Sequence, residues 1–181
     1  MDFMKVIILD RDGIINHDSE YYIKSIDEFV FLPGSVDAIV KLTKNHYRIG
    51  IATNQSGIAR GLYDTDILNE IHAKLQATIS NAGGKITEIA FCPHHPEDLC
   101  SCRKPKPGML LDLANRFKCK PREMIFVGDK ETDIMAAKAI GAEPILIYSS
   151  MTKPNLLTKY PALQAFASLA EYVDNLLISQ N

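Results

Sequence analysis

The sequence lacks any apolar run that approaches the roughly 20 residues of a transmembrane helix. It also lacks a charge excess, because 20 Lys and Arg residues against 22 Asp and Glu residues give a formal net charge of -2. Such a balance gives no general attraction to nucleic acid or to an anionic membrane. The first apolar run is short and is followed at once by acidic and turn residues, so we expect no signal peptide. We therefore expect a cytoplasmic protein without nucleic-acid or membrane partners.

Internal repeats and low-complexity tracts are also absent from the sequence. Its 181 residues, of which 46% are hydrophobic and 23% charged, suit ordinary packing around one core. We therefore expect a single domain over residues 1–181. A small domain of this kind can form an open site without a second chain, so we predict a monomer.

Short apolar runs alternate with helical patterns along the chain, which is typical of parallel α/β units. Continuous apolar runs favour strands that are buried on both faces of a sheet. The predicted strands are Val6–Leu9, Tyr47–Ala52, Ile86–Phe91, Met124–Val127 and Pro144–Tyr148. The predicted helices are Ser35–Lys44, one N-capped by Asp64, one that begins at Pro107, Thr132–Ile140, and one capped by Ser168 and Glu171. The expected fold class is therefore a Rossmann-like three-layer α/β domain with a central parallel sheet.

Polar segments that contain glycine follow four of these strands. They are Asp10–Asn16, Thr53–Gly61, Pro93–Gly108 and Gly128–Asp133. Ligands of open α/β sheets bind at the carboxyl ends of the strands. We therefore expect one pocket to gather residues from all four segments.

Carboxylates dominate two of these segments. Asp10 and Asp12 follow the first strand at i and i+2, a spacing that also occurs in ordinary surface turns. Asp129 and Asp133 are one helical turn apart, so both side chains can face the same point. The simpler interpretation of the second pair is negative charge that complements a helix N-terminus. That interpretation accounts for one aspartate better than for two beside Gly128.

Together the segments resemble the haloacid-dehalogenase-like (HAD-like) phosphatases. The resemblance rests on four motifs in the right order, each expected after a strand: DRDG at 10–13, TNQSG at 53–57, RKP at 103–105 and GDKETD at 128–133. It covers roughly residues 5–150 and implies a fold without a large cap domain, because only a loop, a strand-like segment and a helix separate the first two motifs.

The resemblance implies a phosphatase that depends on Mg²⁺ and uses Asp10 as a covalent nucleophile. Asp12 would be the general acid and base, Thr53 would donate a hydrogen bond to the phosphoryl group, and Lys104 would neutralise its charge. The Mg²⁺ ligands would be the carboxylates of Asp10 and Asp129 and the backbone carbonyl of Asp12, with Asp133 left open. Lys106 is the rival for the position of Lys104, but the family pattern places the lysine directly before proline.

A cluster of thiols and imidazoles occupies residues 92–102, CPHHPEDLCSC. Three thiolates and one imidazole form an ordinary tetrahedral zinc set. The family pattern selects Cys92, His94, Cys100 and Cys102 as the ligands, with His95 as the rival of His94. Four protein ligands would make the zinc structural and would fix a loop over residues 92–108. We expect Cys119 to take no part.

Phosphatases with this zinc loop resemble two groups, which act on D,D-heptose 1,7-bisphosphate or on histidinol phosphate. The stretches at 53–61, 92–96 and 102–110 favour the first group, which serves nucleotide-activated heptose and lipopolysaccharide biosynthesis. The resemblance implies that Arg103 holds a second phosphate of a small sugar bisphosphate. The other implied substrate-binding residues are Asp18, Ser19, Glu20, Tyr21, Asn54, Gln55, Ser56 and Lys130.

Three alternatives stay open at this point. The chain could be a histidinol-phosphate phosphatase, or a zinc-stabilised protein that holds phosphates without turnover. A nucleic-acid 3′-phosphatase is a third interpretation, which the negative net charge disfavours. The intact set of Asp10, Asp12, Thr53, Lys104 and Asp129 argues for an enzyme.

Overall fold

A computed structural model describes residues 5–179 of the chain. Its centre is a parallel sheet of six strands in the order β3-β2-β1-β4-β5-β6. The strands are β1 Val6–Leu9, β2 Arg48–Asn54, β3 Glu88–Cys92, β4 Met124–Gly128, β5 Glu143–Ile147 and β6 Gln164–Phe166. The strand order reverses between β1 and β4, which is where parallel α/β sheets open a crevice for ligands.

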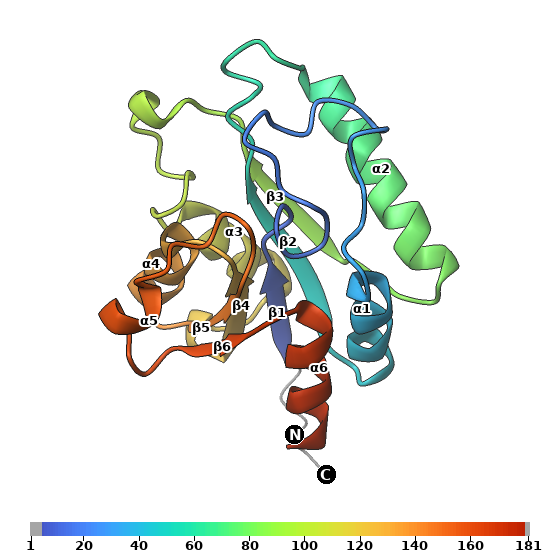
Figure 1. Ribbon diagram of the computed structural model, residues 1–181, viewed down its shortest axis with the longest axis vertical. Helices are drawn as coiled ribbons and strands as arrows, with labels where there is room; N and C mark the ends of the chain where they lie inside the picture. Colours follow the sequence, from blue (N-terminus) through green and yellow to red (C-terminus); the bar gives the residue numbers. More distant parts are fainter. Residues whose placement is uncertain (1–4, 180–181) are drawn as a thin grey trace.

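Helices cover both faces of the sheet (Figure 1). They are α1 Ser35–Lys44, α2 Thr65–Asn81, α3 Gly108–Phe117, α4 Glu131–Ala139, α5 Leu156–Lys159 and α6 Leu169–Ile178, with 3₁₀ helices η1 Pro96–Asp98 and η2 Pro121–Glu123. Helices α1, α2 and α6 lie together on one side, whereas α3 and α4 pack on the other. Alternate strand residues serve the two cores: Ile7 and Leu9 face the first, and Val6 and Ile8 the second. The three-layer α/β prediction is confirmed.

The element bounds follow the predictions closely where local signals are strong. Strand Val6–Leu9 and helix Ser35–Lys44 have the predicted limits. Asp64 caps α2, because its side chain accepts a hydrogen bond from the backbone N–H of Ile67 at 2.9 Å. Pro107 lies just before α3 rather than within its first turn. Strand β6 and helix α5 have three and four residues and were not predicted.

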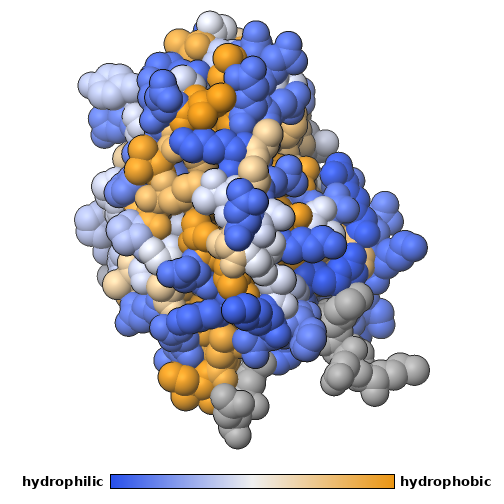
Figure 2. Space-filling view, turned by 90° about the vertical axis from the view of Figure 1, so that its right-hand side faces the viewer, coloured by the Kyte–Doolittle hydropathy of each residue, from blue (hydrophilic) through white to orange (hydrophobic). Residues whose placement is uncertain are grey.

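The hydropathy of the surface varies over the face that carries α1, α2 and α6. Hydrophilic residues cover most of it, and hydrophobic residues show as smaller patches between them (Figure 2). Among the helices in residues 5–179, none has the length and hydrophobicity to cross a bilayer.

Candidate active site

A cavity of about 320 Å³ lies at the carboxyl ends of the strands. Each of the four polar segments from the sequence contributes to its lining. The lining residues are Asp10, Asp12, Asp18, Ser19, Glu20, Tyr22, Ile23, Thr53, Asn54, Gln55, Ser56, Arg103, Lys104, Lys130, Thr132, Asp133 and Met151. The expected convergence of distant segments is therefore present in the structure.

Asp10 stands at the end of β1, where its backbone N–H still donates to the carbonyl of Val127 on β4. Its carboxylate accepts a 2.8 Å hydrogen bond from the N–H of Arg11 and lies 3.0 Å from Nζ of Lys104. Burial raises the pKa of Asp10 to about 6, although the Lys104 ammonium acts in the opposite direction. One carboxylate oxygen is thus kept beside a cation at the cavity.

Lys104 is only 3% exposed and gathers three partners. Its ammonium lies 2.7 Å from Asp133 and 3.0 Å from Asp10, and it donates to the carbonyl of Ala52 at 2.9 Å. Burial disfavours the charged ammonium, but Asp10 and Asp133 outweigh that effect and raise the pKa of Lys104. By contrast, Lys106 is exposed and donates to the carbonyl of Leu99. The structure therefore brings Lys104, and not Lys106, to Asp10.

Asp12 is held by a hydrogen-bond network that the sequence did not reveal. Arg11 is fully buried, and its guanidinium donates to both carboxylate oxygens of Asp12 at 2.9–3.1 Å. Asn16 and Gln55 add amide donors at 2.8 and 2.9 Å. Burial alone would raise the pKa of Asp12, but the Arg11 charge and these hydrogen bonds lower it. Asp12 is therefore an anion in this arrangement.

The orientation of the Gln55 amide follows from its partners. Because the Asp12 carboxylate only accepts hydrogen bonds, the amide NH₂ of Gln55 must face it, and it also donates to Oγ1 of Thr53 at 2.8 Å. The amide oxygen then accepts from the Tyr63 hydroxyl at 2.5 Å. Since Thr53 accepts here, its own hydroxyl hydrogen is free to donate into the cavity.

Asn54 uses its side chain within the protein. The amide donates to the backbone carbonyl of Lys104 and accepts from the backbone N–H of Lys104, both at 3.1 Å. This reciprocal pair fixes the lysine's backbone beside β2. The predicted contacts of Asn54 and Gln55 with substrate stay predictions, because the structure shows both amides engaged with protein atoms.

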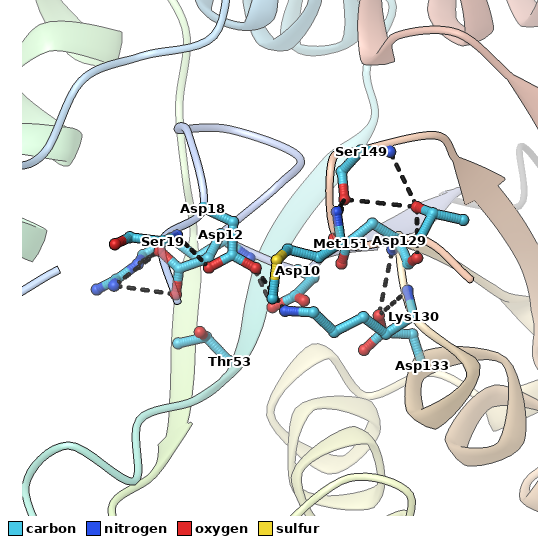
Figure 3. Close-up of polar contacts among 12 residues, drawn as sticks. Asp10, Asp12, Asp18, Ser19, Thr53, Asp129, Lys130, Asp133, Ser149 and Met151 are labelled. Carbon is cyan, nitrogen blue, oxygen red and sulfur yellow. Dashed lines mark hydrogen bonds and ion pairs between the residues drawn. The ribbon is translucent and has the colours of Figure 1, made fainter. Parts of the chain in front are cut away.

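Asp129 directly follows β4, and Asp133 lies in the first turn of α4, where it lines the cavity (Figure 3). Both backbone N–H groups of Asp129 and Lys130 donate to Oδ2 of Asp133, at 3.2 and 3.0 Å. A side chain at Gly128 would place Cβ 2.4 Å from Cβ of Asp133, so this close approach needs glycine. Gly13 has φ +85°, and a Cβ there would lie 2.4 Å from Oδ2 of Asp129. Gly128 thus leaves room for Asp133 beside the end of β4, and Gly13 leaves room for Asp129 beside the first motif.

The carboxylates of Asp10, Asp129 and Asp133 offer oxygen atoms that lie within 4.8 Å of one another. Burial, followed by the charge of Asp10, raises the pKa of Asp129 to about 8. Among the described residues, Oδ1 of Asp129 is buried without a hydrogen-bond partner. Clustered carboxylate oxygens and an unpartnered buried acceptor fit a hard cation such as Mg²⁺.

Two further cations line the cavity, Arg103 and Lys130. Lys130 makes a 2.6 Å ion pair with Asp18, which joins two predicted substrate residues to each other. Arg103 is half-buried, and its Nη1 has no hydrogen-bond partner within residues 5–179. Ser19 and Glu20 line the cavity, whereas Tyr21 is 78% exposed and is not part of the lining. Tyr22 and Ile23 take the place that the sequence analysis gave to Tyr21.

The predicted zinc ligands gather in one cluster outside the cavity. Sγ of Cys92 lies 3.6 Å from Sγ of Cys100 and 3.5 Å from Nδ1 of His94. Cys102 lies 3.5 Å from Cys100 and 3.2 Å from His94. A tetrahedral ion with bonds of about 2.3 Å separates its ligands by about 3.7 Å, so the spacing fits zinc. His95 instead caps η1 by accepting from the N–H of Glu97.

The segment after β5 contributes residues that the sequence analysis missed. Ser149 donates to Oδ2 of Asp129 at 2.5 Å, Thr152 donates to the carbonyl of Asp129 at 2.8 Å, and Met151 lines the cavity (Figure 3). The strand-end rule, applied to the predicted strand Pro144–Tyr148, would have marked this segment as well. The pairing of Arg11 with Asp12 had no comparable signal.

Comparisons with known proteins decide the family. The chain is 50% identical over 144 residues to a D-glycero-beta-D-manno-heptose-1,7-bisphosphate 7-phosphatase of Pseudomonas putida, which covers 80% of this chain and 82% of the relative. The corresponding phosphatase of Neisseria meningitidis serogroup A is 46% identical over 153 residues, or 84% of this chain and 82% of the relative. The chain belongs to this family of phosphatases.

Further similarities agree with membership of the heptose bisphosphate phosphatase family. The HAD-hydrolase-like family model matches residues 101–176. The crystal structure of D,D-heptose 1,7-bisphosphate phosphatase from B. bronchiseptica, complexed with magnesium and phosphate, superposes with a TM-score of 0.90. It is 40% identical and covers 97% of this chain and 99% of its own. The HAD-like fold prediction is confirmed.

Proposed function

We propose that the chain removes the 7-phosphate of D-glycero-β-D-manno-heptose 1,7-bisphosphate, the substrate in the names of its relatives. The observation that carries the proposal is the position of Asp10, whose carboxylate borders the cavity 3.0 Å from the buried Lys104 ammonium. A carboxylate beside a fixed cation can approach the phosphorus of an anionic ester, because the cation offsets part of the mutual repulsion.

In the first step, an oxygen of Asp10 attacks phosphorus, and the bond between phosphorus and the sugar oxygen breaks. The new bond makes an aspartyl-phosphate, and Asp12 gives its proton to the departing sugar oxygen. Lys104 and the free hydroxyl hydrogen of Thr53 hold the phosphoryl oxygens. Since Asp12 is an anion in the structure, the negative charge of the arriving phosphate must raise its pKa before it can carry that proton.

In the second step, water attacks the phosphorus of the aspartyl-phosphate. Asp12 accepts a proton from this water, and the bond between phosphorus and the Asp10 oxygen breaks to release inorganic phosphate. The anionic form of Asp12, held by Arg11, suits this step directly. Asp10 is then a free carboxylate again, and Asp12 releases its proton to solvent once phosphate has left and its pKa falls.

Asp10 and Asp129 would hold Mg²⁺ with their carboxylates and Asp12 with its backbone carbonyl. When bound, the ion offsets the charge of the phosphate ester. Asp133 already contacts the Lys104 ammonium and two backbone N–H groups. It would therefore hold Lys104 and the β4–α4 turn in place. Cys92, His94, Cys100 and Cys102 would hold a structural zinc. Because Cys102 adjoins Arg103 and Lys104, that zinc would fix the loop that carries both cations.

The second phosphate of the substrate would bind outside the catalytic centre. Arg103 has an unpartnered Nη1, and its planar fork suits a phosphate. Lys130 can assist, and Asp18, Ser19 and Glu20 lie close enough to the cavity to contact sugar hydroxyls. That the chain is a monomer with a single domain over residues 1–181 stays a prediction.

The proposal is tested by magnesium-dependent phosphate release from a panel of substrates. We expect the β anomer of heptose 1,7-bisphosphate to be hydrolysed with the highest kcat/KM, ahead of the α anomer and of histidinol phosphate. Asp10→Asn should abolish turnover and leave the unfolding transition in place. Faster hydrolysis of histidinol phosphate would replace the substrate assignment, and parental turnover by Asp10→Asn would contradict the covalent mechanism.

A further inference from the structure

The carboxylate of Asp129 is held on one side by the segment that follows β5. Ser149 donates its hydroxyl to Oδ2 of Asp129 at 2.5 Å. Thr152 donates to the backbone carbonyl of Asp129 at 2.8 Å and accepts from the N–H of Ser149 at 2.9 Å. The side chain and the backbone of Asp129 are therefore both tied to one short turn, although the two segments are separated by about twenty residues of sequence.

The hydrogen-bond directions in this turn are determined by the partners. The backbone N–H of Met151 donates to Oγ of Ser149 at 3.0 Å, so this oxygen already serves as an acceptor. The single hydroxyl hydrogen of Ser149 is then available for Asp129, whose carboxylate can only accept in the ionised form that binds a cation. The hydrogen bond to Oδ2 is thus a donation from serine, fixed in direction by the backbone of the turn.

The other carboxylate oxygen is left without a partner. Oδ1 of Asp129 is buried and unpartnered among the described residues, and it belongs to the carboxylate group that gathers with Asp10 and Asp133. A carboxylate with one oxygen bound and one free has a defined orientation. A Cβ at position 13 would lie 2.4 Å from Oδ2, so the carboxylate occupies the space that a side chain at this position would take. Oδ2 of Asp129 is therefore held by the protein, whereas Oδ1 is available for a ligand.

We propose that Ser149 is a positioning residue, which binds Oδ2 of Asp129 and thereby aims Oδ1 at the cation site. The inference rests on the proposed role of Asp129 as a magnesium ligand. Partners that hydrogen-bond to a metal-binding carboxylate orient it, and their loss typically weakens metal affinity or activity about 10–100-fold. Ser149 therefore acts on cation affinity without touching substrate.

The test compares four forms of the full-length chain: the parent, Ser149→Ala, Ser149→Thr and Ser150→Ala. Ser150 is the matched control, because it is the exposed neighbour of Ser149 in the same turn. Mg²⁺ is titrated into each protein by calorimetry in zinc-containing, magnesium-free buffer, and the melting temperature is measured with and without Mg²⁺. We expect Ser149→Ala to raise the Kd for Mg²⁺ about 10-fold, the lower end of that range. Ser149→Thr should keep near-parental affinity because it retains a hydroxyl, and Ser150→Ala should match the parent.

The outcomes separate this inference from the proposed function. If the parent and Ser149→Ala bind Mg²⁺ equally well, the role of Ser149 is refuted while the metal site stands. If the parent binds no Mg²⁺, the proposed metal site fails and the role of Ser149 fails with it. If Ser149→Ala melts lower without Mg²⁺ but gains the parental stabilisation on adding it, Ser149 is structural only and the inference is again refuted.

Discussion

Replacement of Lys104 by methionine tests the electrostatic core of the site. Methionine keeps an unbranched apolar side chain of similar length but removes the ammonium that lies 3.0 Å from Asp10 and 2.7 Å from Asp133. The side chains of all three residues are at most 7% exposed, so water cannot replace the lost charge. Two buried carboxylates would lose their shared cation.

The expected loss of stability is large for a single substitution. Removing one partner of a buried ion pair costs about 3–5 kcal/mol, which for a chain of this size corresponds to a melting temperature lower by about 6–20 °C. In the proposed mechanism the ammonium also stabilises the charge of the transferring phosphoryl group. Loss of one such stabilising donor typically lowers kcat about 10²–10³-fold.

The stability loss should depend on pH. The pKa of Asp10 in the folded protein is about 6, above its ordinary value of 3.8. Asp10 therefore contributes stability that is fully present below about pH 4 and is lost as the pH rises through 6. Without the Lys104 ammonium this pKa rises further, so the loss continues to higher pH. The stability difference between variant and parent should be greater at about pH 8 than at about pH 5.

The assay measures urea unfolding in magnesium-free buffer at both pH values, together with phosphate release in the presence of Mg²⁺. Lys106→Met is the matched control, because Lys106 is exposed and its ammonium donates to the Leu99 carbonyl, away from Asp10 and Asp133. We expect this control to keep parental stability and kcat. Equal stability of the two variants at about pH 8, or parental turnover by Lys104→Met, would refute the electrostatic argument.

Two further predictions concern the zinc cluster and the first motif. Metal analysis of gently purified protein should give about one zinc per chain for the parent and for Cys119→Ser, and near zero for Cys102→Ser; bound zinc in Cys102→Ser would contradict the ligand set. Gly13→Ala and Gly141→Ala both place alanine at positive φ, +85° and +73°. Gly141→Ala should lose about 1–2 kcal/mol of stability in denaturant unfolding, and Gly13→Ala should lose more because of its clash. Only Gly13→Ala brings Cβ within 2.4 Å of Asp129, so only this variant should also lose phosphatase activity; equal kcat in the two would show that Asp129 adjusts freely.

The sequence predicted those parts of the fold that local patterns determine. Strand β1 is an uninterrupted apolar run, and α1 follows a Pro-Gly turn, so both were placed correctly. Strand β6 has only three residues, which is too short for a periodic pattern, and its pairing with β5 is set by tertiary packing. Helix α5 has one turn and no side-chain cap, so it also lacked a signal.

In the site, too, the sequence predicted which residues would converge but not which partners their side chains would bond. The rule that ligands bind where parallel strands end predicted that Asp10, Thr53 and Lys104 would share one cavity, and all three line it. It could not tell whether a polar side chain would face the ligand or the protein. Asn54 bonds to the backbone of Lys104, a choice that depends on a loop fifty residues away.

The ion pair between Lys130 and Asp18 has a consequence for ligand selection. Both residues line the cavity, although they lie far apart in the sequence. A ligand can recruit the Lys130 ammonium only by competing with the Asp18 carboxylate for it. A doubly charged phosphate group can win that competition through its stronger attraction to the ammonium, whereas a neutral sugar leaves the contact closed. If the proposed function holds, we expect this ion pair to select ligands by charge, before any sugar hydroxyl is recognised.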